Sequence, residues 1–212
     1  AEQVISNQAQ DVADVHAALL DDDGDMDVLV ALSEDDTVAW YENLGDGSFS
    51  DRQVISDQID GASSVQAGDF NGNGRSDVLA GYHAGDADWE GGVVWYENLG
   101  SGTFAPGHEL AGSDDGGSKA RPVDLDGDSD LDVLYDSCWH GGLRWFENLG
   151  GGSFSASNSL TEGSWAGYWD IRDFHPADLD GDTDVDILLC NGYDNAVGWQ
   201  RNGGDGTFTC VR

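Results

Sequence analysis

One eleven-residue segment occurs four times along the chain. The copies are AWYENLGDGSF (39–49), VWYENLGSGTF (94–104), RWFENLGGGSF (144–154) and GWQRNGGDGTF (198–208). Their tryptophans are 55, 50 and 54 residues apart. A period of this length is typical of repeated structural units that pack on their neighbours. The 212 residues therefore divide into four units, approximately 1–51, 52–106, 107–156 and 157–212, which we expect to form a single domain.

Each unit is predicted to form four β-strands, because short apolar or alternating runs lie between clusters of Gly, Asp and Asn. The first strand enters an acidic segment, the second leaves it, and the third carries the repeated Trp. The fourth strand is expected to begin at a phenylalanine in each unit, namely Phe49, Phe104, Phe154 and Phe208. Four-stranded units repeated around an axis predict an all-β fold, a β-propeller of four blades. The tryptophans are expected to pack between blades.

The two ends of the chain suggest how the propeller closes. EQVIS at 2–6 matches RQVIS at 52–56, which follows Phe49, the phenylalanine at which a fourth strand is predicted to begin. The N-terminal strand is therefore expected to complete the final blade of its own ring. It could equally complete a blade of a neighbouring molecule by strand exchange, which would give a homo-oligomer or filament.

The chain is strongly acidic, with a formal net charge of −34. Nucleic acids and anionic membrane surfaces attract Lys and Arg, so neither is an expected partner. Membrane insertion is not expected either, because no apolar run reaches the roughly 18 residues that a spanning helix needs. Of the 42 acidic residues 34 are Asp, and this excess favours turns and metal-binding loops.

The acidic segment between the first two strands also recurs four times. The copies are LLDDDGDMD (19–27), DFNGNGRSD (69–77), DLDGDSDLD (124–132) and DLDGDTDVD (178–186). In the last three copies, positions 1, 3, 5 and 9 all carry oxygen side chains, whereas the first copy has Leu19 at position 1. Position 7 is expected to offer its backbone carbonyl, because Arg75 cannot ligate a cation through its side chain. The predicted metal ligands are Asp21, Asp23, Asp25 and Asp27; Asp69, Asn71, Asn73, Arg75 and Asp77; Asp124, Asp126, Asp128, Asp130 and Asp132; and Asp178, Asp180, Asp182, Asp184 and Asp186.

Calcium fits these ligands best, because it takes six to eight oxygens in irregular loops, whereas magnesium demands a stricter octahedron. Zinc prefers Cys and His, which the segments lack. An EF-hand would need a Glu at loop position 12, where Tyr135 and Leu189 stand. Solvated acidic turns are the alternative, but four at a fixed place favour up to four calcium ions. The first segment departs at Leu19 and the second is less charged, so the third and fourth are predicted to bind most tightly.

These segments resemble the FG-GAP/VCBS repeat family. The resemblance rests on AGDFNGNGRSDVLAG (67–81), VDLDGDSDLDVLY (123–135), ADLDGDTDVDILL (177–189) and the WYENLG…GTF segment, and it covers essentially the whole chain. It implies a β-propeller with calcium in the hairpin between the first two strands of each blade. It also implies a secreted or cell-surface protein used in adhesion or carbohydrate binding. The family usually builds about seven blades, and only four repeats are present here.

The segments that differ most between units contain aromatic residues outside the repeated Trp position. A sugar can stack its apolar face on such rings while nearby polar groups bind its hydroxyls. These rings could equally fill gaps between blades. The candidate ligand-binding residues are Trp89, Trp139, His140, Trp165, Tyr168 and Trp169.

The sequence thus predicts a secreted, non-catalytic binding or adhesion module whose partner is a glycan or a cell surface. One alternative is a structural subunit of an extracellular fibre or layer, joined by strand exchange. A polysaccharide-active enzyme is the third possibility. We predict no catalytic residues, because no Ser-His-Asp pattern, phosphate loop or Cys-His pairing is recognisable. His16, Gln66, Arg121 and His175 share a place in the four units, where they are expected to form a polar lining.

Overall fold

The computed structural model describes residues 4–84, 90–112, 117–137, 142–160, 171–192 and 195–211. These residues form four four-stranded sheets and one small hairpin. The first sheet contains β1 (Val12–Ala18), β2 (Asp27–Leu32), β3 (Thr37–Tyr41) and β4 (Gln53–Ser56). The second contains β5 (Ala62–Gly68), β6 (Asp77–Ala84), β7 (Glu90–Tyr96) and β10 (His108–Ala111). The hairpin pairs β8 (Asn98–Gly100) with β9 (Thr103–Phe104).

The third sheet contains β11 (Ala120–Val123), β12 (Asp132–Ser137), β13 (Gly142–Phe146) and β14 (Asn158–Ser159). The fourth contains β15 (Ile171–Ala177), β16 (Asp186–Asn191), β17 (Ala196–Asn202) and β18 (Phe208–Val211). All pairings within the sheets are antiparallel and join strands in chain order. The described part of the chain contains no helix, and hence no helix able to cross a membrane. The prediction of an all-β fold with four four-stranded sheets is confirmed.

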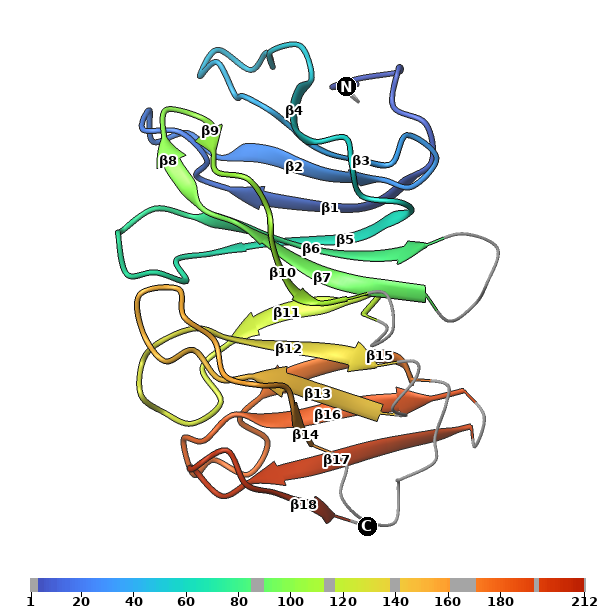
Figure 1. The fold of residues 1–212 in the computed structure, drawn as a ribbon, viewed down its shortest axis with the longest axis vertical. Coiled ribbons are helices and arrows are strands. Elements are labelled where there is room, and N and C mark those ends of the chain that lie inside the picture. The colour runs from blue at the N-terminus through green and yellow to red at the C-terminus, as the bar shows by residue number, and fades with distance from the viewer. Residues whose placement is uncertain are drawn as a thin grey trace.

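The sheets follow one another along the longest axis of the molecule in chain order (Figure 1). The N-terminus lies beside the first sheet and the C-terminus beside the fourth, at opposite ends of this stack (Figure 1). A closed ring of four blades would bring the first and fourth sheets together. This part of the prediction is therefore not confirmed.

The predicted start of the fourth strand is wrong in three of the four sheets. Only β18 begins at its phenylalanine, Phe208, whereas β4, β10 and β14 each begin four residues after theirs. In these three sheets the phenylalanine instead pairs with the asparagine before the glycine turn, for example Asn148 with Phe154. That pairing closes a small hairpin first, so the main strand can begin only after it.

This shift moves the boundaries of the units. The sheets span residues 12–56, 62–111, 120–159 and 171–211, so the fourth strands of the first three lie beyond our boundaries at 51, 106 and 156. The RQVIS segment is the outer edge of the first sheet. Residues 4–10 form no strand, and Ile5 and Gln8 line a hollow beside Tyr41 and Arg52. The described N-terminal stretch thus lies on the first sheet and does not complete the fourth, which has its own outer strand.

Successive sheets pack face to face through the repeated tryptophans. Trp40 and Val38 of the first sheet form one buried cluster with Val65 and Val78 of the second. The second and third sheets meet through Trp95, and the third and fourth through Trp145, in equivalent clusters. The predicted position of the tryptophans between sheets is confirmed for these three. Trp199 lies on the outward face of the last sheet and is only half-buried.

A glycine of the next sheet receives each of these three tryptophan rings. At Gly152, with φ +75°, a Cβ would lie 2.5 Å from a ring carbon of Trp95, which is closer than real side-chain carbons approach. Its neighbour Gly151 has φ +63°, but a Cβ there would meet no atom within 4 Å. Both glycines therefore need a positive φ, but only Gly152 also needs the absence of a side chain, because Trp95 lies against it.

We expect Gly152→Ala to reduce the free energy of unfolding by about 3 kcal/mol, because it adds overpacking against Trp95 to the cost of a left-handed alanine. Gly151→Ala, the matched control, should cost only about 1 kcal/mol. Urea denaturation of both variants measures the difference. Equal losses would show that the close approach to Trp95 is not what holds the two sheets.

Candidate functional site

The acidic segments form the hairpins between the first and second strands of the four sheets, as predicted. In the third hairpin, Asp124 accepts hydrogen bonds from the backbone N–H of Gly127 (2.8 Å) and Ser129 (3.0 Å). Asp126 accepts from Asp128 N–H at 3.2 Å, and Asp128 accepts from Asp130 N–H at 2.9 Å. Short aspartate side chains bind nearby backbone in this way, so the sequence itself coils the loop. The fourth hairpin repeats these bonds.

The last aspartate of each hairpin is fully buried and fixes the hairpin to the third strand. Asp132 accepts one hydrogen bond from Leu125 N–H and another from Asn148 N–H, both at 2.8 Å. Equivalent pairs of bonds are made by Asp27, Asp77 and Asp186. A buried carboxylate is costly unless its oxygens are satisfied, and these two N–H groups provide part of that compensation.

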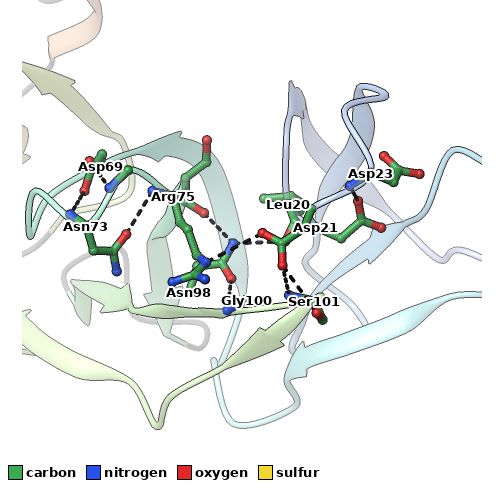
Figure 2. A network of polar contacts seen from close by, with 12 residues as sticks. Leu20, Asp21, Asp23, Asp69, Asn73, Arg75, Asn98, Gly100 and Ser101 are labelled. Atoms are coloured by element: carbon green, nitrogen blue, oxygen red, sulfur yellow. Dashed lines mark hydrogen bonds and ion pairs between the residues drawn. The ribbon is translucent and has the colours of Figure 1, made fainter.

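The asparagine at or just after the end of the third strand carries the connection to the preceding sheet. Asn148 Nδ2 donates to the Phe70 carbonyl of the second hairpin at 2.7 Å and to the Leu131 carbonyl of its own at 3.1 Å. Asn98 and Asn202 reach the preceding hairpins in the same way. In Figure 2, Asn98 lies between the first two hairpins, and Ser101 extends toward the first. Each of the first three hairpins is thereby held by the sheet that follows it.

Three hairpins bring carboxylate oxygens close together. In each group, one oxygen per residue lies within 4.8 Å of the others; the groups are Asp21, Asp23 and Glu42; Asp124, Asp126 and Asp132; and Asp178, Asp180 and Asp186. At this distance, repulsion between two unit charges is roughly 3–4 kcal/mol at an effective dielectric constant of about 20. Oxygens that share one calcium ion lie at most about 5 Å apart, twice the ion–oxygen distance. The oxygens of each group are therefore close enough to share one metal ion.

Not all predicted ligands join these groups. The position 7 side chains of Asp25, Asp130 and Asp184 lie beside the glycine two residues after the turn asparagine of their own unit. The Arg75 guanidinium lies 3.7 Å from Asp22 of the first hairpin. Position 7 therefore has only its backbone carbonyl to offer. Asp128 and Asp182, at position 5, are also outside the groups.

Sequence reasoning missed Glu42. It lies two residues after the repeated Trp, and Glu97 and Glu147 occupy the same place in the next two units. In the second hairpin, Glu97 accepts a hydrogen bond from Asn71 Nδ2 at 3.0 Å, so it too faces the loop. A glutamate recurs at this place in WYEN, WYEN and WFEN, and this recurrence could have indicated a further ligand.

In the second hairpin, the aspartate and asparagine side chains mainly accept hydrogen bonds from the backbone of the same hairpin. Asp69 accepts from the N–H groups of Asn73 and Gly74, and Asn73 accepts from Arg75 N–H, as drawn in Figure 2. Asp77 anchors the hairpin as described above. Two asparagines in place of aspartates lower the local charge and with it the repulsion.

The fourth hairpin carries its own cation. Arg201 stands where the other units have glutamate, and its Nε lies 2.6 Å from Asp180. Its terminal nitrogen lies 2.9 Å from Asp182 and lowers the pKa of that carboxyl. An arginine at this place neutralises part of the charge that would otherwise attract a metal ion.

In the third hairpin burial raises carboxyl pKa values, whereas Arg201 lowers the pKa of Asp182 in the fourth. Loss of water around Asp132 raises its pKa to about 7, although its two backbone hydrogen bonds oppose the shift. Desolvation, together with the charges of Asp128 and Asp124, also raises the pKa of Asp126. A neutralising cation would therefore offset the cost of charging these two carboxylates.

A hollow of about 260 Å³ lies between the second and third sheets. Trp95 and His108 stack at its wall with ring centroids 5.1 Å apart, and Phe154, Glu109 and Ser155 also line it. The six aromatic and histidine residues predicted to bind a ligand lie outside the described residues. In the first three sheets the first residue of the fourth strand pairs with the repeated Trp, and it differs from sheet to sheet as Gln53, His108 and Asn158. This variation at a fixed place was the feature of the sequence that could have indicated the hollow.

Comparison with known proteins agrees with the repeat recognised in the sequence. Residues 20–80 match the model of the FG-GAP-like repeat. A solved structure of an Agrocybe aegerita lectin that recognises non-reducing terminal N-acetylglucosamine is similar, with a TM-score of 0.64 and 20% sequence identity. The similarity covers 93% of this chain and 50% of the lectin, so the chain spans about half its length. No curated protein matches the sequence.

We expect Asn148→Ala to reduce the free energy of unfolding by about 3 kcal/mol, because it leaves the Phe70 carbonyl without its buried donor. Asn158→Ala, on the exposed edge of the third sheet, should cost less than about 0.5 kcal/mol. Chemical denaturation of both variants tests this. Similar small losses would mean that the asparagine does not hold the preceding hairpin.

Proposed function

We propose that the chain is a calcium-dependent, non-catalytic glycan-binding module that acts outside the cell. The observation that carries the proposal is the convergence of carboxylate oxygens in hairpins with the FG-GAP-like repeat pattern. The likeness to a lectin shows the fold, and the ligand of that lectin suggests where to begin the search for this one. A hollow lined by aromatic and polar groups between two sheets supplies a candidate binding surface.

Calcium would be held in the third hairpin by Asp124, Asp126 and Asp132, with the Asp130 carbonyl as a further oxygen. Bound there, the ion supplies positive charge and fixes the loop; it takes no part in a reaction. Because binding energy becomes part of the folding energy, the ion would stabilise the hairpin that the next sheet holds. The first hairpin offers Asp21, Asp23 and Glu42 in the same way.

The hairpins are proposed to differ in affinity. The sequence predicted the third and fourth to bind most tightly, but Arg201 gives a reason to separate them. Its guanidinium lies against Asp180 and Asp182, where it competes with an incoming cation. We therefore rank the third hairpin highest and place the fourth below it.

The hollow beside Trp95 has the chemistry that a sugar ring needs. His108 is exposed and Phe154 is half-buried, so both offer ring surface at the wall. Glu109 and Ser155 offer hydrogen-bonding groups for hydroxyls or an acetamido group. Sugars with an acetamido group are the first ligands to test.

An extracellular location follows from the metal chemistry. Calcium at millimolar concentration outside cells would fill weak sites of this class, whereas cytosolic calcium would not. A high acidic charge keeps such a module soluble among anionic surfaces.

We expect Arg201→Glu to strengthen calcium binding at the fourth hairpin at least tenfold, because it exchanges a competing cation for a possible ligand. Arg52→Glu, which alters an exposed ion pair with Asp35 on the first sheet, is the charge-matched control. Isothermal titration calorimetry with calcium compares the two variants. Unchanged binding in Arg201→Glu would remove the fourth hairpin from the proposal.

We expect His108→Ala to weaken binding of a glycan with terminal N-acetylglucosamine at least tenfold, because it removes the exposed ring at the hollow. Asn158→Ala changes the register-equivalent residue opposite Trp145 and should leave binding unchanged. A glycan array selects the ligand, and calorimetry measures its affinity. If neither the wild type nor the variants bind any glycan on the array, the glycan part of the proposal is wrong while the calcium part stands.

A further inference from the structure

The outward face of the fourth sheet is exposed at positions where the other sheets are fully buried. In the fourth sheet Leu179, Leu188 and Val197 are 41%, 38% and 75% exposed. Their equivalents in the other three sheets are at most 1% exposed, because the next sheet covers them; these are Leu20, Leu29 and Val38, then Phe70, Leu79 and Val93, then Leu125, Leu134 and Leu143. The fourth sheet therefore presents the same apolar surface with no following sheet on it.

The opposite end of the stack shows the complementary exposure. Val15 of β1 is 60% exposed on the side that faces away from the second sheet. Its register equivalents, Val65, Ala120 and Phe174, are at most 2% exposed because each packs on the preceding sheet. On the face of the first sheet that elsewhere receives a preceding sheet, Val15 is thus exposed, while Val30, Ala39 and Tyr41 are buried in a cluster with Ala9 and Phe49.

Among the described residues, the hydrogen bond that joins successive sheets also lacks a partner at each end of the stack: the first sheet has the donor Asn43, and the fourth has the acceptor carbonyl of Leu179. Asn43 Nδ2 donates to the Met26 carbonyl of its own hairpin at 3.1 Å, as its three equivalents do in theirs. Those equivalents also donate to the carbonyl at position 2 of the preceding hairpin. For Asn43 no described residue supplies that second acceptor, and the atom that corresponds to it is the Leu179 carbonyl.

We propose that the fourth sheet of one molecule packs on the first sheet of a second copy, and that two such contacts close a ring of eight sheets. Asn43 of each copy would donate to the Leu179 carbonyl of the other, while Val197 and Leu188 would be covered. The two surfaces lie at opposite ends of one chain (Figure 1), so a second copy is the natural source of the complement.

Two observations favour a closed pair over an open stack. A head-to-tail contact either closes into a ring or grows into a fibre, and a propeller of up to eight blades is a common closed form. The similar lectin is about twice as long as this chain, so two copies reach its length. Residues 4–10, which lie beside Tyr41 without forming a strand, would have to move aside.

Charge sets the conditions for this assembly. Each chain carries −34, so two copies repel one another at low ionic strength. Salt screens this repulsion, and calcium bound in the hairpins would lower the charge itself. The pair is therefore expected to form more readily with calcium chloride at physiological ionic strength.

The test is sedimentation velocity of the full chain over a range of micromolar concentrations, with calcium chloride and then with chelator. We expect a species of two copies, about 45 kDa or twice the chain mass of 22.5 kDa. Val197→Glu and Val15→Glu should each shift this species to the monomer, since each places a charge on one half of the contact. Leu149→Glu, at a leucine that is 60% exposed on the turn after β13, should leave it unchanged.

Both positions are exposed in the single chain, so circular dichroism should show that the variants keep the fold. A wild type that stays monomeric in calcium overturns the proposal. A two-copy species that survives both Val197→Glu and Val15→Glu also overturns it, and would favour exchange of terminal strands. A mass other than two copies contradicts the closed ring. None of these outcomes bears on glycan or calcium binding by the single chain.

Discussion

In every sheet, the carboxylate that ends the acidic hairpin accepts hydrogen bonds from two backbone N–H groups. One belongs to the second residue of the same hairpin, and the other belongs to the asparagine of the third strand. In the second, third and fourth sheets this asparagine also donates to the preceding hairpin, so a single buried contact links a loop, its own sheet and its neighbour. The tryptophan and glycine contacts fill the space between sheets, but this polar connection sets how the sheets align. The acidic hairpins are therefore structural elements of the stack as well as candidate metal sites.

The sequence was sufficient to predict the elements that repeat. The period of the Trp segment gave the four sheets, and alternating aspartates at fixed places gave the hairpins between the first two strands. It was insufficient where a contact depends on register. The fourth strand starts later than predicted because Phe154 pairs with Asn148 before the main strand begins. Glu42 was missed because its approach to Asp21 and Asp23 depends on how the third strand lies beside the hairpin.

The path of the whole chain was the least predictable feature. Closure into a ring depends on the small rotation between successive sheets, and no single residue pattern encodes that rotation. The matching segments at 2–6 and 52–56 suggested that the N-terminus completes the fourth sheet, but the described N-terminal residues lie on the first. The exposed Val197 and Val15 become understandable only when both ends of the stack are compared with the contacts inside it.

We propose that a cation stabilises the clustered carboxylates of the hairpins. The direct measurement is the free energy of unfolding of the chain after exhaustive removal of metal, compared with the same protein in millimolar calcium at equal ionic strength. The account predicts a loss of several kcal/mol on metal removal, reversed by calcium and far less by magnesium. Equal stability in the two conditions would contradict it, and would show that the hydrogen bonds of the hairpins alone overcome the repulsion of their charges.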